Sequence, residues 1–294
     1  MTLLVTGASG FLGAHIMQEA MRRGIDALGV IHEHACPVDA PSVKLDLCDS
    51  RAVMSLVRDV RPAAIIHAGA LTSPDRCEQL PNEASAVNAT AAGVLAMAAF
   101  AADAHLTFVS TDLVFRGDIG MYAETDQPEP INHYARTKAQ AEHFVRAANP
   151  DFAVVRPSFI YGEPLAEHHG SFSHALFRNL TLGVHTTVFH DQFRSPIPAH
   201  ALAAALLEIS SERMSGVWHV AGPERVSRAE FARELARVAG LDPAPLEEIS
   251  MDDVALPAPR PRDVSLNTVK ARLRLQTTLP SLTDGFHFLY GKGG

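Results

Sequence analysis

Cysteine is scarce in this chain of 294 residues. The three cysteines, Cys36, Cys48 and Cys77, form no C-x-x-C pair, and their number is odd. A disulfide framework needs paired cysteines, and zinc sites usually place cysteine or histidine at short fixed spacings. The sequence therefore indicates neither, and we expect a reducing, cytoplasmic compartment.

Clusters of positive charge are also missing. The chain has 25 Lys and Arg against 33 Asp and Glu, a formal net charge of -8, and no long basic run. Nucleic-acid binding needs clustered cations that contact phosphates. Nucleic acid is therefore not expected as a partner, although a small basic pocket remains compatible with this composition.

Long uninterrupted apolar runs are absent too. The most apolar stretch, residues 84–106, is mostly alanine and contains Asn88, Thr90, Asp103 and His105. A buried helix explains it better than a membrane span. The first strand-like residues stand at position 2 or 3, which leaves no room for a secretion signal. We expect no association with a membrane.

Short aliphatic runs that alternate with helical patterns dominate what is present. The chain is 47% hydrophobic and 20% charged, as in ordinary globular proteins. Continuous apolar runs separated by helices are typical of a parallel sheet covered on both faces. The sequence predicts an α/β, Rossmann-like, doubly wound parallel sheet. Its strands are expected at 3–6, 27–32, 64–68, 106–110 and 152–156, and its helices at 12–23, 50–60, 83–102 and 133–147.

A glycine-rich turn follows the first apolar run. The segment TGASGFLG places Gly7, Gly10 and Gly13 between a predicted strand and a predicted helix. Glycines allow a tight turn and a close approach to a pyrophosphate, and a helix N-terminus offers unpaired N–H groups. The turn predicts a dinucleotide site; a turn that only links strand to helix is the alternative.

The spacing T-G-x-x-G-x-x-G resembles that of the extended short-chain dehydrogenase/reductase family, which also has Tyr-x-x-x-Lys on a later helix. The segment YARTK supplies Tyr134 and Lys138, and FVSTDLVF supplies Ser110 and Thr111 at the end of a strand. The resemblance implies that Thr111, Tyr134 and Lys138 are catalytic. It implies for Ser110 a contact with the cofactor or a supporting role.

Ketone reduction explains why these residue types are needed. Hydride reaches the carbon while a proton reaches the oxygen, so an acid must lie within hydrogen-bond reach of that oxygen. Tyrosine has an ordinary pKa of about 10, and a nearby ammonium group favours the phenolate. We expect Lys138 to lower the pKa of Tyr134. By resemblance, Lys138 also binds the nicotinamide ribose, and Thr111 donates to the carbonyl oxygen.

The choice between the two nicotinamide cofactors is usually made after the second strand. His32 stands there, followed by Glu33, with neither arginine nor aspartate closing the strand. This pattern resembles family members that accept NADPH, so NADP(H) is the expected cofactor and NAD(H) the alternative. The resemblance implies a cofactor-binding set made of Gly7, Ser9, Gly10, Phe11, Leu12, Gly13, His32, Asp46, Leu47, Ala68, Gly69, Ala70, Tyr134, Lys138 and Pro157.

Asp46 and Asn88 are each open to a functional and a structural interpretation. Asp46 matches the family's adenine contact, whereas Asp49, three residues on, is equally well placed to cap a helix. Asn88 matches an asparagine that in the family is structural or belongs to a proton path.

Within the family, the chain is most similar to the dTDP-4-dehydrorhamnose reductase group. The stretches VSTDLVF and YAETDQPEPINHY carry this resemblance. It implies reduction of a 4-keto sugar attached to a nucleotide, and it allows a homodimer. One departure concerns the sugar: the group's R-T-S-W-V-Y-G reads RPSFIYG here, so Phe159 stands where tryptophan is expected.

The chain changes character after Arg156, where turn residues become frequent. We divide it into an NAD(P)-binding domain, residues 1–160, and a smaller C-terminal α/β substrate-binding part, residues 161–294, intertwined with the first. Helices are expected at 171–180, 199–209 and 227–238, the last opening with Ser227 and Glu230 in capping-box spacing, and a strand at 217–221.

The loops after Gly162 are expected to determine which substrate is bound. Arginines can bind a diphosphate in bidentate fashion, which makes Arg194, Arg260 and Arg262 candidates, with surface or structural pairs as the alternative. A nucleotide is expected between Arg156 and the PRPRDVS segment. The substrate-binding set is Thr72, Thr111, Phe159, Arg194 and Arg260.

Histidines gather between residues 168 and 190. Their spacing matches no common metal motif, so no metal site is expected and a loop that covers the substrate is preferred. The histidines concerned are His168, His169, His174, His185 and His190.

Two other functions stay open beside the reductase. A sugar-nucleotide epimerase or dehydratase is one; dehydratases usually have an acidic residue beside the active hydroxyl, and Asp112 follows Thr111. The other is a non-catalytic, NADP-binding regulatory subunit, as the related methionine adenosyltransferase β subunit suggests. Such a subunit has no need of the Thr111, Tyr134 and Lys138 set that this chain retains.

Overall fold

A computed structural model describes residues 2–167 and 169–291 of the chain. Its centre is a seven-stranded sheet in the order β11-β6-β5-β4-β1-β2-β3, with every neighbouring pair parallel. The predicted doubly wound sheet is confirmed. Its strands are β1 (Leu3–Thr6), β2 (Ala27–Ile31), β3 (Ser42–Lys44), β4 (Ala64–His67), β5 (His105–Val109), β6 (Ala153–Pro157) and β11 (Gly216–Val220).

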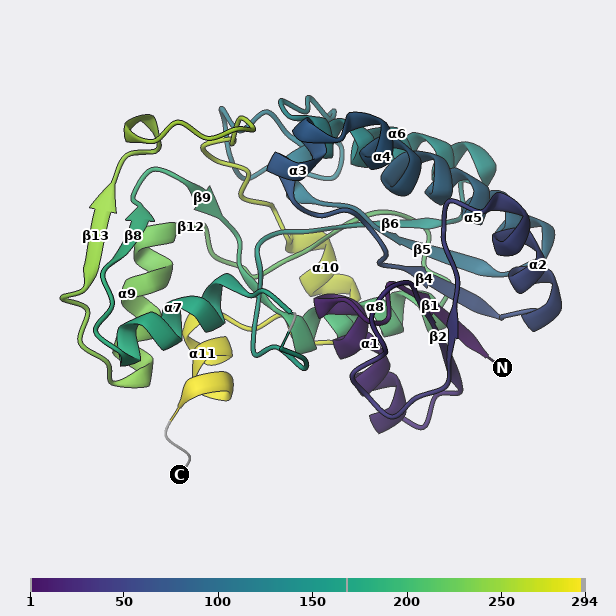
Figure 1. Ribbon diagram of the computed structural model, residues 1–294, viewed down its shortest axis with the longest axis horizontal. Helices are drawn as coiled ribbons and strands as arrows, with labels where there is room; N and C mark the ends of the chain where they lie inside the picture. The colour runs from purple at the N-terminus through teal and green to yellow at the C-terminus, as the bar shows by residue number, and fades with distance from the viewer. Residues whose placement is uncertain (1, 168, 292–294) are drawn as a thin grey trace.

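Helices cover both faces of this sheet (Figure 1). One face packs against α2 (Ser50–Val60), α5 (Ala91–Ala101) and α6 (His133–Ala148). The other packs against α1 (Phe11–Arg22), α8 (Ala199–Ser211) and α10 (Val269–Arg274). The central strands β1, β4, β5 and β6 are therefore buried on two sides, which is why their sequences are continuously apolar.

One continuous helical stretch, Pro81–Ala101, is long and apolar enough to cross a membrane by length and composition, and half of its most apolar window is buried inside the molecule. It consists of α4 (Pro81–Ser85), the π-helical turn η1 (Ala86–Thr90) and α5, preceded by α3 (Pro74–Gln79). The stretch packs against α2 and α6, the position of a core helix.

The C-terminal part lies beyond the strand ends at the left of Figure 1. Its core contains Tyr161, Phe231 and Phe286, with ring centroids 4.9–5.4 Å apart. The capping box of Ser227 and Glu230 is confirmed. The helices are α7 (Phe172–Thr181), α9 (Arg228–Ala239) and α11 (Leu282–Tyr290), and the strand pairs are β7 (Ile160–Tyr161) with β10 (Ile197–Pro198), β9 (Phe193–Arg194) with β12 (Val226–Ser227), and β8 (Thr186–Phe189) with β13 (Leu246–Ile249).

The two parts are interleaved along the chain. The edge strand β11 and the covering helix α8 belong to the sheet layers, although both come after residue 160. A division at residue 160 stays a prediction.

Candidate active site

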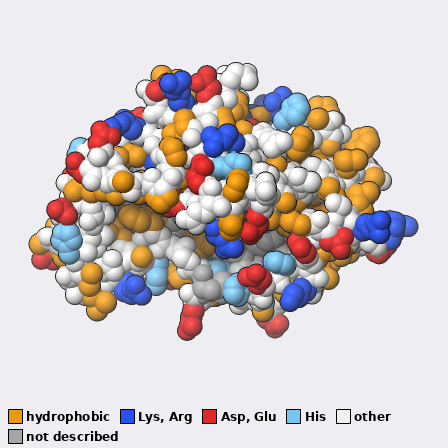
Figure 2. Space-filling view, turned by 45° about the horizontal axis from the view of Figure 1, so that its top comes forward, with side chains coloured by type: hydrophobic (Ala, Val, Ile, Leu, Met, Phe, Trp, Pro, Cys, Tyr) orange, Lys and Arg blue, Asp and Glu red, His pale blue; other side chains and the backbone are white. Residues whose placement is uncertain are grey.

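A cleft of about 820 Å³ opens at the carboxyl ends of the sheet strands, on the side that faces the C-terminal part. The strand order reverses between β1 and β4, which is where doubly wound sheets bind ligands. Figure 2 shows the molecule hollowed between its two parts.

This one cleft gathers the residues that the sequence singled out for cofactor, catalysis and substrate. Their individual roles stay predictions. The lining includes Gly7, Ser9, Gly10, Phe11, Leu12, Gly13, His32, Asp46, Leu47, Ala68, Gly69, Ala70, Thr72, Thr111, Tyr134, Lys138, Pro157, Phe159, Arg194 and Arg260.

The glycine turn has the shape that a phosphate group needs. Gly7 has a φ of +70°, and a Cβ on Gly13 would lie 2.0 Å from the Gly7 carbonyl oxygen, so both positions exclude a side chain. Gly10 precedes α1 and provides no side chain to cap its free N–H groups. The N-terminus of α1 is thus open to an anion at the cleft.

The two aspartates after β3 have different positions. Asp49 caps α2 by accepting from the backbone N–H groups of Arg51 and Ala52. Asp46 lines the cleft, and one of its carboxylate oxygens accepts from the Cys48 N–H.

The three candidate catalytic side chains come from the end of β5 and from α6. Asn132 caps α6 through the Ala135 N–H, which fixes the start of the helix that carries Tyr134 and Lys138. Tyr134 and Lys138 are four positions apart on that helix, and Lys138 Nζ donates to the Val109 carbonyl at 2.6 Å. Thr111 lines the same cleft and lies close enough to Tyr134 to affect the pKa of its phenol. The three side chains therefore meet at one edge of the sheet.

The expected effect of Lys138 on Tyr134 is wrong for this structure. Burial, followed by the negative charge of Asp112, raises the pKa of Tyr134, and the hydrogen bond with Thr111 opposes this rise. Burial also lowers the pKa of Lys138 to about 7, against the attraction of Glu142. The amine of Lys138 contacts the Val109 carbonyl and the Phe108 ring instead.

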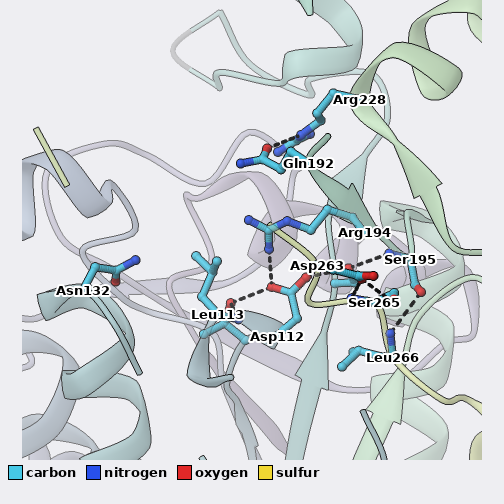
Figure 3. A network of polar contacts seen from close by, with 12 residues as sticks. Asp112, Leu113, Asn132, Gln192, Arg194, Ser195, Arg228, Asp263, Ser265 and Leu266 are labelled. Carbon is cyan, nitrogen blue, oxygen red and sulfur yellow. Dashed lines mark hydrogen bonds and ion pairs between the residues drawn. The ribbon is translucent and has the colours of Figure 1, made fainter. Parts of the chain in front are cut away.

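Asp112 has both carboxylate oxygens engaged. Arg194 Nη1 donates to Oδ1 at 2.7 Å (Figure 3). Ser158 Oγ donates to Oδ2 at 2.6 Å. Thr111 Oγ1 lies 3.3 Å from Oδ1. The carboxylate is buried and ion-paired, with a partner on each of its oxygens.

Ser110 belongs to a second buried network, behind the cleft. Its hydroxyl donates to Glu142 Oε1 at 2.5 Å, and Arg156 donates to both oxygens of the same carboxylate. Arg156 forms a buried ion pair with Glu142 and does not line the cleft. The expectation that a nucleotide lies beside Arg156 is therefore wrong.

Asn88 holds the turn after β4. Its Oδ1 accepts from the Leu71 N–H at 2.8 Å, and its Nδ2 donates to the Leu71 carbonyl and to Thr137 Oγ1. The π-turn at η1 surrounds this residue. These contacts support the structural interpretation of Asn88.

The arginines divide into cleft and surface residues. Arg194 and Arg260 line the cleft, whereas Arg262 pairs with Asp191 and Asp252 outside it. Arg228 also lines the cleft, and the sequence analysis missed it. A signal was available: Arg228 directly follows Ser227, the residue expected to open a helix, and the helix dipole disfavours a cation in the first turn.

No group of three or more His, Cys, Asp or Glu with metal-binding geometry occurs among residues 2–167 and 169–291. His168 lies outside the described residues. His169 Nε2 hydrogen-bonds the Ser9 carbonyl at 2.7 Å, and its ring meets Phe11 edge to face. The segment after Gly162 therefore contacts the glycine turn.

Comparison with known proteins agrees with this geometry. The RmlD substrate binding domain family matches residues 1–289. The probable low-salt glycan biosynthesis reductase Agl14 of Haloferax volcanii is 34% identical over 97% of this chain and 95% of its own. The dTDP-4-dehydrorhamnose reductase of Mycobacterium tuberculosis is 35% identical over 88% of this chain and 82% of its own.

Two further similarities bear on function. The methionine adenosyltransferase 2 subunit beta of Pongo abelii is 32% identical over 91% of this chain and 80% of its own. The crystal structure of the Bacillus anthracis dTDP-4-dehydrorhamnose reductase, in complex with NADP, has a TM-score of 0.86 at 26% identity and covers 98% of each chain. The resemblance drawn from the motifs is confirmed.

Proposed function

Because the chain belongs to the RmlD substrate binding domain family, we propose that it is an NADP(H)-dependent reductase of a nucleotide-linked 4-keto sugar, with NAD(H) as the alternative cofactor. The observation that carries the proposal is the meeting of Thr111, Tyr134 and Lys138 in the cleft into which the glycine turn opens. The NADP complex of the Bacillus anthracis relative supports the choice of cofactor.

The residues present fit a dinucleotide. Gly7, Gly10 and Gly13 leave space at the N-terminus of α1, whose free N–H groups suit a pyrophosphate. His32 lines the cleft directly after β2, at the position where an acidic residue would bind the free 2′-OH of the ribose. Histidine at this position suits a 2′-phosphate. When bound, the reduced nicotinamide supplies a hydride.

Tyr134 is the proton donor in this proposal. Burial raises the pKa of its phenol, so the group stays protonated at neutral pH. It would give its proton to the carbonyl oxygen of the substrate, so that the C=O double bond becomes a C–O single bond as new O–H and C–H bonds form. Thr111 orients the same oxygen by a hydrogen bond. The positive charge of Arg194 favours the phenolate that remains.

In this proposal the substrate contacts Thr72, Phe159, Arg194 and Arg260, which all line the cleft. The position of Asp112 argues against the dehydratase alternative, because Arg194 and Ser158 occupy both oxygens of its carboxylate. A homodimer and a cytoplasmic location stay predictions.

The direct test is NADPH oxidation with a dTDP-4-keto-6-deoxy sugar. The wild-type protein should oxidise NADPH in the presence of the keto sugar. Tyr134→Phe should lower the rate of NADPH oxidation by about 10²–10⁴-fold because the proton donor is lost. No turnover by the wild type, or full turnover by Tyr134→Phe, would reject the reductase. Cofactor retained through each cycle would indicate an epimerase or dehydratase.

Similarity to methionine adenosyltransferase subunit beta favours one other function, a regulatory subunit. Affinity purification from the native cell distinguishes it. A stoichiometric enzyme partner, together with no activity on any sugar nucleotide, would reverse the proposal.

A further inference from the structure

Arg228 is a cleft arginine without a counter-ion. Among the described residues, four arginines line the cleft: Arg76, Arg194, Arg228 and Arg260. Three of them form ion pairs, with Glu83, Asp112 and Asp75 respectively. Arg228 forms none in the described part of the chain, and its Nη1 is buried without a hydrogen-bond partner.

The Arg228 side chain is held in place. Its Nε donates to Gln192 Oε1 at 3.0 Å, a contact drawn in Figure 3, and its backbone N–H donates to the Gln192 carbonyl. The guanidinium carbon lies 3.6 Å from the ring centroid of Phe159 and 5.1 Å from that of Phe172. Stacking leaves the edge of the guanidinium as the direction for further hydrogen bonds.

This arrangement is unfavourable without a bound anion. Arg228 is half-buried, and its Nη1 has lost hydration that no hydrogen-bond partner among the described residues replaces. The first turn of α9 adds the positive end of a helix dipole. Burial, with repulsion from Arg194, lowers the pKa of Arg228 to about 9, so the group is still charged at neutral pH.

The position of Arg228 within the cleft indicates which anion would bind to it. Arg194 donates to Asp112, the residue after Thr111, whereas Arg228 donates to Gln192, two positions before Arg194 in the chain (Figure 3). Arg194 therefore lies between Arg228 and Asp112, which is next to Thr111 in the chain. An anion at Arg228 is separated from the reacting carbonyl, as the diphosphate of a nucleotide sugar is separated from a carbonyl across the sugar ring.

We propose that Arg228 is a specificity residue that binds the substrate's diphosphate through its free guanidinium edge, so that the chain selects nucleoside diphosphate sugars over monophosphates and free sugars. This inference rests on the proposed function. The shared chemistry, a phosphate group, could also come from the 2′-phosphate of the cofactor, and the experiment separates these two sources.

The experiment is calorimetric titration of the full chain with dTDP, UDP, dTMP and NADPH in turn. Arg228→Gln should weaken binding of dTDP or UDP by about tenfold to a hundredfold, the effect of a lost hydrogen bond to a charged group. Binding of NADPH should not change, and Arg228→Lys should fall between because ammonium lacks the planar fork. Arg237→Gln, an exposed, paired arginine on the same helix, is the matched control.

Thermal unfolding of the ligand-free variants controls for folding. Arg228→Gln removes an uncompensated charge, so its midpoint should equal or exceed that of the wild type. Unchanged affinity of Arg228→Gln for dTDP and UDP, an equal loss for NADPH, or no binding of either diphosphate by the wild type overturns the inference. Arg228-dependent binding of dTDP without reduction of any keto sugar would reject the proposed function alone.

Discussion

Arg194 donates to Asp112 at 2.7 Å although 82 positions separate the two residues in the chain. Asp112 begins the short 3-10 helix η2 (Asp112–Val114) after β5, and Arg194 ends β9 in the C-terminal part. Asp112 also accepts from Ser158, whose hydroxyl accepts from the Ser195 N–H. This chain of contacts fixes the C-terminal part against the edge of the sheet that carries Thr111.

Removing the carboxylate of Asp112 should therefore destabilise the fold. We expect Asp112→Ala to lower the free energy of unfolding by about 3–5 kcal/mol, because Arg194 is left as an unpaired buried charge. Urea unfolding measures the loss. The double variant Asp112→Ala/Arg194→Met should recover part of it; a loss below about 1 kcal/mol in the single variant would place this pair with ordinary surface ion pairs.

This pair also shows what the sequence could not predict. The motif after β5 identified Thr111, and the alternation of apolar runs and helices identified the sheet, because local patterns carry both. The partner of Asp112 depends on a contact across 82 positions, and no local pattern encodes it. The same holds for Arg156, whose pairing with Glu142 removed it from the expected nucleotide site.

The short strands of the C-terminal part were missed for a different reason. The strands β7, β9, β10 and β12 contain two residues each, too few for any periodicity to appear. The electrostatic error at Tyr134 arose from burial, since the distance between an amine and a phenol and their dehydration are properties of the packed structure.

Two glycines of the opening turn should respond differently to alanine. In Gly13→Ala the new Cβ would lie 2.0 Å from the Gly7 carbonyl oxygen, and relief of this clash should cost about 1–3 kcal/mol of folding stability. At Gly10 the nearest atom is 3.2 Å away and φ is -87°, so the fold should tolerate Gly10→Ala.

Cofactor binding separates the same two variants. The methyl group added in Gly10→Ala would stand at the start of α1, where the proposed pyrophosphate lies. The variant should therefore bind NADPH more weakly while unfolding at nearly the wild-type temperature. Fluorescence titration with NADPH, paired with thermal unfolding, measures both properties. Equal stability of the two variants would contradict the packing argument, and unchanged NADPH affinity of Gly10→Ala would contradict the phosphate site.

The buried carboxylate of Glu142 should be essential for stability. It accepts from Arg156 through both oxygens and from Ser110 at 2.5 Å. Glu142→Gln leaves the Arg156 guanidinium buried without a counter-ion, and we expect a loss of about 3–5 kcal/mol by urea unfolding. Glu234→Gln, which removes a surface pair with Arg237, serves as the control and should cost far less.

Stability of the ligand-free protein should rise with pH because of Lys138. Burial lowers the pKa of this amine to about 7, whereas an unfolded chain restores its ordinary value of about 10.4. Between these two values the unfolded state binds a proton that the folded state does not, so alkaline solution favours folding.

The comparison between wild type and Lys138→Met isolates this contribution, because the other titrating groups are common to both proteins. From pH 7 to pH 10, the free energy of unfolding of the wild type minus that of the variant should increase by up to about 1.4 kcal/mol per pH unit. Lys44→Met, at an exposed position of β3, should follow the wild type. A difference between wild type and Lys138→Met that does not change over this range would mean that Lys138 keeps its proton in the fold, and the amine would then be charged before any cofactor arrives.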